Sequence, residues 1–320
     1  MMHLDMPLEQ LKTYLGKSPK PADFDEYWDR ALAELDSASL DYELVKADIE
    51  APGVECFNLY FTGVGGAKIR CMLARPAEQK TAGPGILLFH GYSSSSGDWF
   101  DKIGYAALGF TVLAMDCRGQ GGYSTDTLLV EGTNLRGHII RGLDDPNPDH
   151  LYYRHVFLDT AHAARILMSM ETVDEKRVGV YGVSQGGALA IACAALQPDV
   201  KEVVAVYPFL SDFRRVWEMD IQNTAYEEIA YFFRQFDPAH EREEEIFNRL
   251  GYIDIQNLAD RIKANVLWVT AMRDMVCPPS TQFAAYNKIR SNKEMLIYYE
   301  YGHEYLLGLA DIALKRFLSM

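Results

Sequence analysis

The feature that most constrains the fold of this chain is a series of short apolar runs that begins after Gly85. Each run has the length of one strand, and runs that are apolar on both faces are typical of parallel strands covered by helices on both sides. The runs lie at 86–89, 110–115, 178–181, 203–206, 266–269 and 295–299. Segments with helical periodicity lie between them or follow them, at 98–108, 152–170, 188–196, 280–289 and 305–318. This alternation predicts a doubly wound, mostly parallel α/β sheet.

The segment 1–84 follows a different pattern. Asp23 is placed to cap a helix whose apolar residues recur on one face, namely Phe24, Tyr27, Trp28, Ala31 and Leu35. Extended stretches follow at 42–50, 55–61 and 68–74, and Gly-containing turns at 52–53 and 63–66 separate them. This segment therefore predicts an N-terminal helical arm and antiparallel strands at one edge of the sheet.

Two later segments interrupt the alternation of strands and helices. Residues 125–150 are rich in Gly, Asp and Pro and predict a long loop. Residues 212–251 contain two helical patterns, around 224–236 and 241–250, and predict a helical insertion. The chain shows no internal repeat and no low-complexity linker, so we expect 1–320 to form a single domain.

Composition excludes several classes of function. The formal charge is −14, which would repel nucleic acids and anionic membrane surfaces. No window approaches the roughly 18 apolar residues of a membrane helix. Residues 1–10 lack the apolar core of a signal peptide. The five cysteines, Cys56, Cys71, Cys117, Cys193 and Cys277, are widely spaced and suggest neither a disulfide framework nor a zinc site. We therefore expect a soluble protein of the reducing cytoplasm.

The motif that carries chemistry is Gly182-Val183-Ser184-Gln185-Gly186. It directly follows the predicted strand at 178–181 and directly precedes the predicted helix at 188–196. This strand–turn–helix context distinguishes a nucleophile elbow from a serine in an ordinary Gly-rich turn. The context predicts that Ser184 is the nucleophile of a serine hydrolase with the α/β-hydrolase fold.

A serine nucleophile needs a general base and an acid that orients it, in the chain order Ser, Asp or Glu, His. His303 follows the predicted strand at 295–299, whereas His240 lies in the acidic insertion. Asp274 follows the predicted strand at 266–269, whereas Asp254 and Asp260 precede that strand and would lie at its wrong end. We therefore predict His303 as the base and Asp274 as the acid. The alternative for Asp274 is a helix cap or a salt bridge with Arg273.

Two backbone N–H groups should form the oxyanion hole. Gln185, after the nucleophile, supplies one, and Tyr92, in the loop after the predicted strand at 86–89, is the candidate for the other. The Tyr92 ring, with Pro208 and Phe209, predicts a small acyl pocket. His90 in the same loop is expected to shape the loop, because the triad is complete without it.

No metal or cofactor site stands out. The remaining histidines, His138, His150, His155 and His162, lack metal-ligand spacing. Residues 118–122 (RGQGG) follow a strand but lack the spacing of a dinucleotide-binding loop, and no phosphate loop is present. We expect no metal and no cofactor, and we interpret 118–122 as a structural loop beneath the site.

Several segments of the chain together resemble one known family. They are 90–92 (HGY), 118–121 (RGQG), 182–186 (GVSQG), 303–304 (HE), 21–25 with Trp28, and 274–281 (DMVCPPST). The chain is similar in these segments to carbohydrate esterase family seven, the acetyl xylan esterases and cephalosporin C deacetylases, and the match spans nearly the whole sequence. The RGQG and CPPST strings make the resemblance more specific than the elbow alone.

The resemblance implies removal of acetyl groups from small acetylated sugars such as xylo-oligosaccharides, and from cephalosporin C. It implies an intracellular homohexamer, a trimer of dimers whose active sites face an internal cavity, with contacts in the segment before Gly85. It also implies the same triad, Ser184, Asp274 and His303, and the same oxyanion donors, Tyr92 and Gln185.

Two alternatives stay open at this point. One is a peptidase of the prolyl-oligopeptidase type, which shares fold and triad order, although the N-terminal part is too short for a propeller. The other is a non-catalytic binding protein on the hydrolase fold, which a complete triad argues against.

Overall fold

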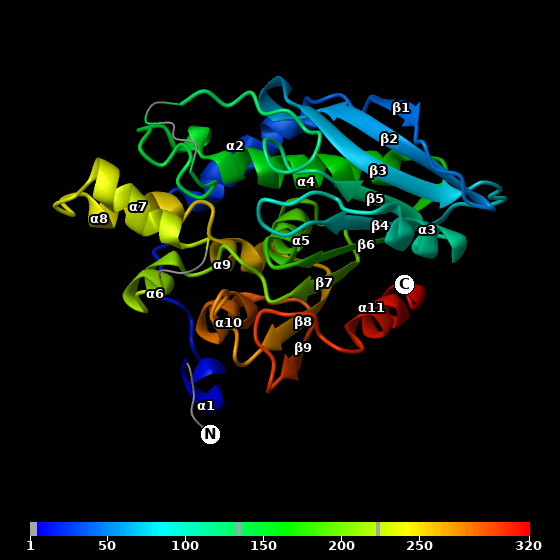
Figure 1. Ribbon diagram of the computed structural model, residues 1–320. Coiled ribbons are helices and arrows are strands. Elements are labelled where there is room, and N and C mark those ends of the chain that lie inside the picture. The colour runs from blue at the N-terminus through cyan, green and yellow to red at the C-terminus, as the bar shows by residue number, and fades with distance from the viewer. Residues whose placement is uncertain (1–4, 131, 133–135, 222–224) are drawn as a thin grey trace.

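A single twisted sheet organises the computed structural model, which describes residues 5–130, 132, 136–221 and 225–320. Within these residues the strand order is β1-β2-β3-β5-β4-β6-β7-β8-β9 (Figure 1). The strands are β1 (Tyr42–Lys46), β2 (Val54–Thr62), β3 (Lys68–Pro76), β4 (Gly83–Phe89), β5 (Thr111–Met115), β6 (Val173–Val183), β7 (Glu202–Val206), β8 (Asn265–Ala271) and β9 (Lys293–Tyr298). Each predicted apolar run coincides with one of these strands, except that Phe110 and Tyr299 lie just outside β5 and β9.

The direction of the strands changes at β3. Strands β1, β2 and β3 pair antiparallel, and β3 also pairs antiparallel with β5. All the other pairs of neighbouring strands, from β5–β4 to β8–β9, are parallel. The chain moves outward from β4 to β5 and then returns to form β6 on the other side of β4. In open α/β sheets, ligands bind at the carboxyl ends of the strands next to such a reversal. The prediction of an α/β-hydrolase fold with an antiparallel N-terminal edge is confirmed.

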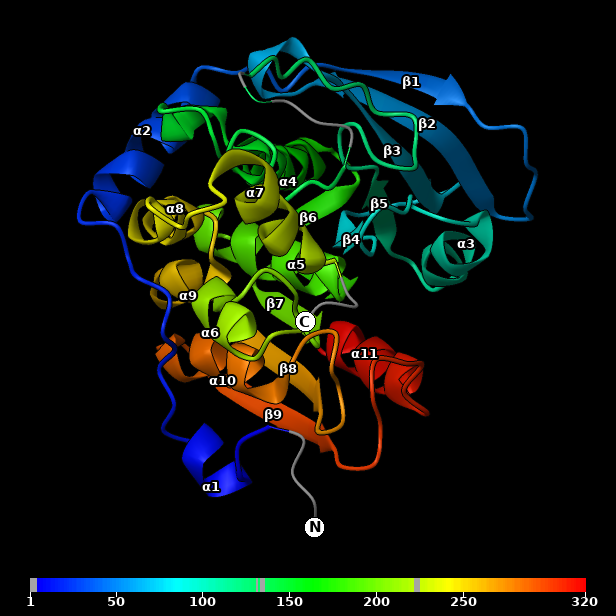
Figure 2. The ribbon, with the colours of Figure 1, turned by 60° about the vertical axis from the view of Figure 1, so that its left-hand side comes forward.

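Helices cover both faces of this sheet (Figures 1 and 2). α4 (Tyr152–Ser169) and α5 (Gln185–Leu196) pack against the central strands from one side, and every residue of α5 is buried. α3 (Trp99–Ala107) packs on β3 and β5, and α11 (Leu309–Leu318) packs on β7. α10 (Pro279–Lys288) lies between β8 and β9 in the chain. α11 begins later than its pattern predicts, because Gly308 directly before it has a φ of 80°.

The N-terminal arm packs on its own chain. α1 (Leu8–Leu11) comes first, and α2 (Phe24–Asp36) then buries its apolar face, with the Trp28 indole N–H donating to the carbonyl of Tyr252 at 3.0 Å. The prediction that Asp23 caps α2 is only half right. Asp23 occupies the N-cap position, but its φ of −99° and ψ of 17° are not the extended conformation of a capping residue. Its carboxylate instead accepts a hydrogen bond from the Tyr252 hydroxyl at 2.5 Å.

The insertion holds more helix than its pattern predicts. α7 (Glu227–Phe236) and α8 (Glu243–Leu250) match the two predicted helices, although the predicted start at Thr224 lies outside the described residues. A further helix, α6 (Phe213–Glu218), precedes them, and α9 (Ile255–Leu258) follows just after the insertion ends. In Figure 1, α6, α7 and α8 lie together at one end of the molecule.

The remaining described segments are short. They include the 3₁₀ turns η1 (Val64–Gly66), η2 (Pro148–His150) and η3 (Ala259–Arg261), and η2 is the only helical turn in the described part of the predicted loop at 125–150. Across the part of the chain that the structure describes, no helix combines the length and apolar character that a membrane crossing requires.

Candidate active site

The candidate residues come together at the carboxyl edge of the parallel sheet. Ser184 directly follows β6, Asp274 and His303 follow β8 and β9, and Tyr92 follows β4. Parallel strands end at the same edge, so residues far apart in the sequence meet there. β4 and β6 are neighbours in the sheet, which sets the Tyr92 loop beside Ser184.

Ser184 occupies a strained turn. Its φ of 59° and ψ of −118° lie outside the regions that a residue with a side chain normally adopts. Its N–H donates to the carbonyl of Val206 at 2.9 Å, and its own carbonyl accepts from Ala188 at 3.1 Å. A Cβ at Gly182 would lie 2.0 Å from the carbonyl oxygen of Gly186, so only glycine permits this approach. The geometry is that of a nucleophile elbow.

His303 and Asp274 form a hydrogen-bonded pair. The Nδ1 atom of His303 lies 2.8 Å from Oδ2 of Asp274, and the Asp274 side chain is fully buried. The other carboxylate oxygen, Oδ1, accepts from the backbone N–H groups of Val276 and Cys277, each at 2.8 Å. Because an ionised carboxylate only accepts hydrogen bonds, Nδ1 of His303 carries the proton and Nε2 is left as the basic nitrogen.

The alternatives considered for the base and the acid lie elsewhere. Arg273 forms its ion pair with Glu300 rather than with Asp274. Asp254 is buried at the start of α9, where it accepts from the backbone N–H of Gln256 at 3.1 Å. His240 lies in the insertion, 3.1 Å from Glu243.

Two residues of the site were missed by reasoning from the sequence. The ring of Tyr207 lies 4.5 Å from the ring of His303, and its hydroxyl donates to the carbonyl of Glu304 at 2.9 Å. Cys277 lies beside the pair, and its backbone N–H donates to Oδ1 of Asp274 at 2.8 Å. Tyr207 directly follows β7, so its position after a strand could have identified it. Cys277 has no such signal, because its spacing from Asp274 resembles that of any buried loop residue.

Asp274, Cys277 and His303 are also the one set of three potential metal ligands that lie together among the described residues, within 4.8 Å of one another. Burial, and then the Asp274 carboxylate, raise the pKa of the Cys277 thiol well above its ordinary value. A thiol binds metals as the thiolate. Asp274 and His303 are hydrogen-bonded to each other. The set therefore fits a hydrogen-bonded catalytic group better than a metal site.

The predicted oxyanion donors lie at the start of α5 and in the loop after β4. Ser184 is the N-cap of α5, so the N–H of Gln185 belongs to the first helical turn, whose N–H groups have no partner within the helix. Within the described residues, no hydrogen bond is formed by the backbone N–H of Tyr92 or of Gln185. Both groups are thus available to a ligand, and the helix terminus favours negative charge there.

The Gln185 side chain links the loop after β4 to the RGQG segment, because its Nε2 donates to the carbonyl of Gly91 at 3.4 Å and to Oε1 of Gln120 at 3.1 Å. Its Oε1 accepts from the Tyr153 hydroxyl at 2.7 Å and from Gln120 Nε2 at 2.9 Å. Gln120 belongs to the RGQG segment, which therefore contacts the site through Gln185. In the same segment, Arg118 is fully buried and pairs with Asp159, with the Arg118 Nε to Asp159 Oδ2 distance at 2.7 Å.

His90 shapes the loop that carries Tyr92. Its Nε2 accepts from the backbone N–H of Cys117 at 3.0 Å, and its Nδ1 lies 2.7 Å from the carbonyl of Gly91. Burial lowers the pKa of His90, which keeps this ring neutral. The other histidines make separate contacts: His138 with Ser93, His150 with Asp145, His155 with the carbonyl of Asp149, and His162 with the carbonyl of Ser39.

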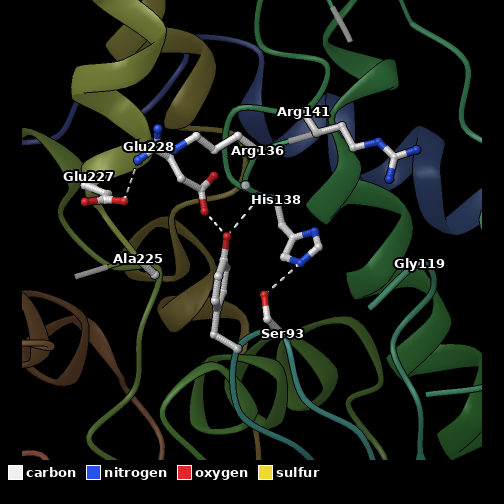
Figure 3. A pocket seen from close by; sticks show the side chains of 10 residues that line it. Ser93, Gly119, Arg136, His138, Arg141, Ala225, Glu227 and Glu228 are labelled. Atoms are coloured by element: carbon white, nitrogen blue, oxygen red, sulfur yellow. Dashed lines mark hydrogen bonds and ion pairs between the residues drawn. The ribbon is translucent and has the colours of Figure 1, made fainter. Parts of the chain in front are cut away.

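A cavity of about 420 Å³ opens beside the Tyr92 ring (Figure 3). Loop residues Ser93, Arg136, His138 and Arg141 line one part of it, and Ala225, Glu227 and Glu228 of the insertion line the other. The Tyr92 ring also meets the ring of Phe209 edge-on, with centroids 5.7 Å apart. Phe209 is itself bonded to the elbow, because its N–H donates to the carbonyl of Ser184 at 3.1 Å.

Comparison with known proteins adds to this geometry. The family model described as acetyl xylan esterase (AXE1) matches residues 1–320. The structure is similar to that of acetyl xylan esterase 1 from Thermoanaerobacterium sp. JW/SL YS485, with 54% identity, a TM-score of 0.96 and coverage of 99% of both chains. It is also similar to the acetyl xylan esterase from Paenibacillus sp. R4, with 35% identity, a TM-score of 0.93 and coverage of 98% and 99%.

A curated relative is longer than this chain. The acetyl esterase Axe7A of Xylanibacter ruminicola is 30% identical over 296 residues, which are 90% of this chain. The match spans only 64% of the length of that relative.

Proposed function

Because the chain belongs to the acetyl xylan esterase family, we propose that it is a serine esterase that removes acetyl groups from small acetylated sugars, such as xylo-oligosaccharides. The observation that carries this proposal is the strained Ser184 elbow at the sheet edge that also carries the pair of buried Asp274 and partly exposed His303. Activity on the acetyl ester of cephalosporin C is part of the same proposal, because its leaving group is also an alcohol of a small molecule. The family favours this reading over a peptidase.

In the proposed reaction, Nε2 of His303 takes the proton of the Ser184 hydroxyl as the oxygen attacks the acetyl carbonyl. The negative charge that develops on the carbonyl oxygen is stabilised by the N–H groups of Tyr92 and Gln185. His303 then gives the proton to the departing sugar oxygen, which leaves an acetyl-serine. Water attacks that ester with His303 as base, and acetate and free Ser184 are released. Asp274 keeps the proton on Nδ1 of His303 and stabilises the imidazolium.

The acyl pocket gives a direct test of the proposal. We expect kcat/KM for aryl esters to fall steeply from acetyl to butyryl and to be negligible by octanoyl. The rings of Tyr92 and Phe209 meet beside the elbow, so a longer chain must displace them and move the carbonyl oxygen from its donors. A displacement of about 1 Å can cost on the order of a hundredfold. The measurement is a series of p-nitrophenyl esters of increasing acyl length.

A lipase would show the opposite order of activity, since each acyl methylene that it buries contributes about 0.8 kcal/mol to the free energy of binding. Equal or rising activity up to octanoyl would contradict the deacetylase proposal. The rates of hydrolysis of acetylated xylo-oligosaccharides and of cephalosporin C, measured at equal concentration, then show which leaving group the enzyme prefers.

We also propose that the protein is a cytoplasmic homohexamer. All five cysteines are buried free thiols, which a reducing compartment preserves. β1 is an edge strand with exposed apolar side chains, Tyr42 at 38% and Val45 at 43%, and Leu40 precedes it at 42%. Exposed sheet edges of this kind are usually covered by another segment or another chain, because their backbone N–H and C=O groups are unpaired. The apolar face of α2 is already buried against its own chain, so we assign the contact to β1 rather than to α2.

Light scattering at micromolar concentration should therefore give a mass near six times the 36.2 kDa of one chain. Replacing Val45 by Lys should lower that mass, because it sets a charge on the proposed contact. Glu50→Lys, outside β1, is the control. A mass near that of one chain for the unmodified protein would rule the assembly out.

A further inference from the structure

One carboxylate links the insertion to the loop that carries Tyr92. Glu228 lies in the first turn of α7, yet it is only 4% exposed. Its Oε1 accepts a short hydrogen bond from the Tyr92 hydroxyl, and its Oε2 accepts from the backbone N–H of Ile139 at 2.7 Å and of Ile140 at 3.3 Å. The N–H of His138 donates to the same Tyr92 hydroxyl at 3.0 Å. In Figure 3, the Glu228 carboxylate and the His138 backbone both meet this hydroxyl, whereas the His138 ring points toward Ser93.

The loop next to Glu228 is built to admit the carboxylate. Gly137 has a φ of 89°, and a Cβ there would lie 2.1 Å from the carboxyl carbon of Glu228. Any other residue at position 137 would displace the carboxyl group and would also be strained. The close approach of Gly137 therefore allows the next residues to aim their N–H groups at Glu228.

These contacts hold the Tyr92 ring at its outer end. The ring packs between Phe209, 5.7 Å away, and the imidazole of His138, 5.0 Å away. Its inner end joins the backbone whose N–H is the proposed oxyanion donor. The orientation of the ring thus constrains the loop after β4, and Glu228 sets the position of the hydroxyl.

We propose that Glu228 is a positioning residue of the esterase: it holds Tyr92 so that the Tyr92 N–H faces the developing oxyanion, and it thereby couples helix α7 of the insertion to the catalytic edge of the sheet. This inference rests on the proposed function. Glu228 touches no reacting atom and acts only through Tyr92.

The ionised form of Glu228 is the form that fits these contacts, because all its described partners are donors. Burial raises the pKa of Glu228 to about 8, and the three backbone N–H groups nearby partly offset that rise. The carboxyl is therefore neutral below about pH 8 and ionised above it. A neutral carboxyl carries a proton on one oxygen, so its contact with Tyr92 must reverse, and the Tyr92 hydroxyl proton then loses its acceptor.

The other charged or titratable groups near Glu228 are not expected to change protonation near pH 8. Arg136 pairs with Glu227 at 3.0 Å, and Arg141 pairs with Asp126 at 2.5 Å. Burial, and then Arg141, lower the pKa of His138 to about 4, so this ring stays neutral above pH 6. Activity should thus contain a component that rises with pH through about 8 and belongs to Glu228.

The test is Glu228→Gln in the full-length protein, assayed on p-nitrophenyl acetate. An amide has one acceptor oxygen, and if that oxygen accepts from Ile139 and Ile140, the NH₂ group faces the Tyr92 oxygen, so the Tyr92 hydroxyl proton loses its acceptor. We expect kcat to fall by on the order of tenfold to a hundredfold with KM little changed, and the component near pH 8 to disappear. Glu244→Gln is the control: it removes an exposed carboxylate from α8 of the same insertion, away from the cavity, and should keep the unmodified rate and profile.

Tyr92→Phe provides a second, independent variant, since it removes the hydroxyl and leaves Glu228 in place. It should also lose the component near pH 8, and the double variant should be no slower than the slower single one. If either single variant keeps the rate and profile of the unmodified protein, the inference is wrong. A loss of rate with the pH profile intact would also overturn it, because Glu228 would then be only structural. If the unmodified protein does not hydrolyse aryl acetates, the proposed function fails instead.

Discussion

Replacing Ser184 by Ala should reduce kcat for acetyl esters by on the order of a millionfold, because the members of a catalytic triad act as a unit. The loss should leave the fold intact. The elbow is held by backbone hydrogen bonds to Val206, Ala188 and Phe209, none of which involves the hydroxyl. The measurement is steady-state hydrolysis of p-nitrophenyl acetate, with near-UV circular dichroism to compare the folds.

A matched control is Ser94→Ala, which removes an exposed hydroxyl from the loop after β4 and should leave activity unchanged. A fluorophosphonate probe should label the unmodified protein and the control but not Ser184→Ala. Retention of more than about a tenth of kcat by Ser184→Ala would refute the assignment of the nucleophile. Absence of labelling in the unmodified protein would favour a non-catalytic role for the fold.

Asp274→Asn should lower kcat about ten-thousandfold, because it places the His303 proton on the wrong nitrogen. Oδ1 of Asp274 accepts from the N–H groups of Val276 and Cys277. These donors will hold the amide oxygen of Asn, so its NH₂ group must face Nδ1 of His303. The imidazole then carries its proton on Nε2 and cannot accept the proton of Ser184.

Arg273→Gln is the control for Asp274→Asn, since it breaks the neighbouring surface ion pair with Glu300 and leaves the buried carboxylate untouched. It should retain nearly full activity. If the two variants lose activity to the same extent, the effect belongs to the loop and not to the tautomer of His303. Parallel measurement of the thermal midpoint separates a loss of stability from a loss of chemistry.

The strands could be predicted because their signal is local. Each parallel strand is buried on both faces, so its apolar run is continuous and easily found in the sequence, as at 86–89 and 203–206.

The exact ends of the helices were harder to predict from the sequence. α5 begins at Gln185 rather than near Ala188, because the elbow passes directly into the helix. Asp23 was correctly placed before α2, but a tertiary partner, the Tyr252 hydroxyl, takes its carboxylate.

The residues nominated at the site share one property, which is their place directly after a predicted strand or in the turn that follows it. That rule led from the sequence to Ser184, Asp274, His303 and Tyr92, because the fold sets the ends of parallel strands at one edge. Tyr207 obeys the same rule and was overlooked. Glu228 could not have been found in this way, since it lies in an acidic helix of the insertion with no strand before it.

The sequence by itself determined the α/β-hydrolase architecture and the candidate catalytic residues, because hydrophobic periodicity and the Gly-flanked elbow are written in consecutive residues. Only the tertiary structure decided how the insertion meets the site. The contact of Glu228 with Tyr92 joins residues that are 136 positions apart. It depends on the close approach at Gly137 and on the burial of a carboxylate that, read in the sequence, looks like one more solvated acid on a charged helix. Burial and long-range hydrogen bonding are properties of the packed chain, and no local pattern encodes them.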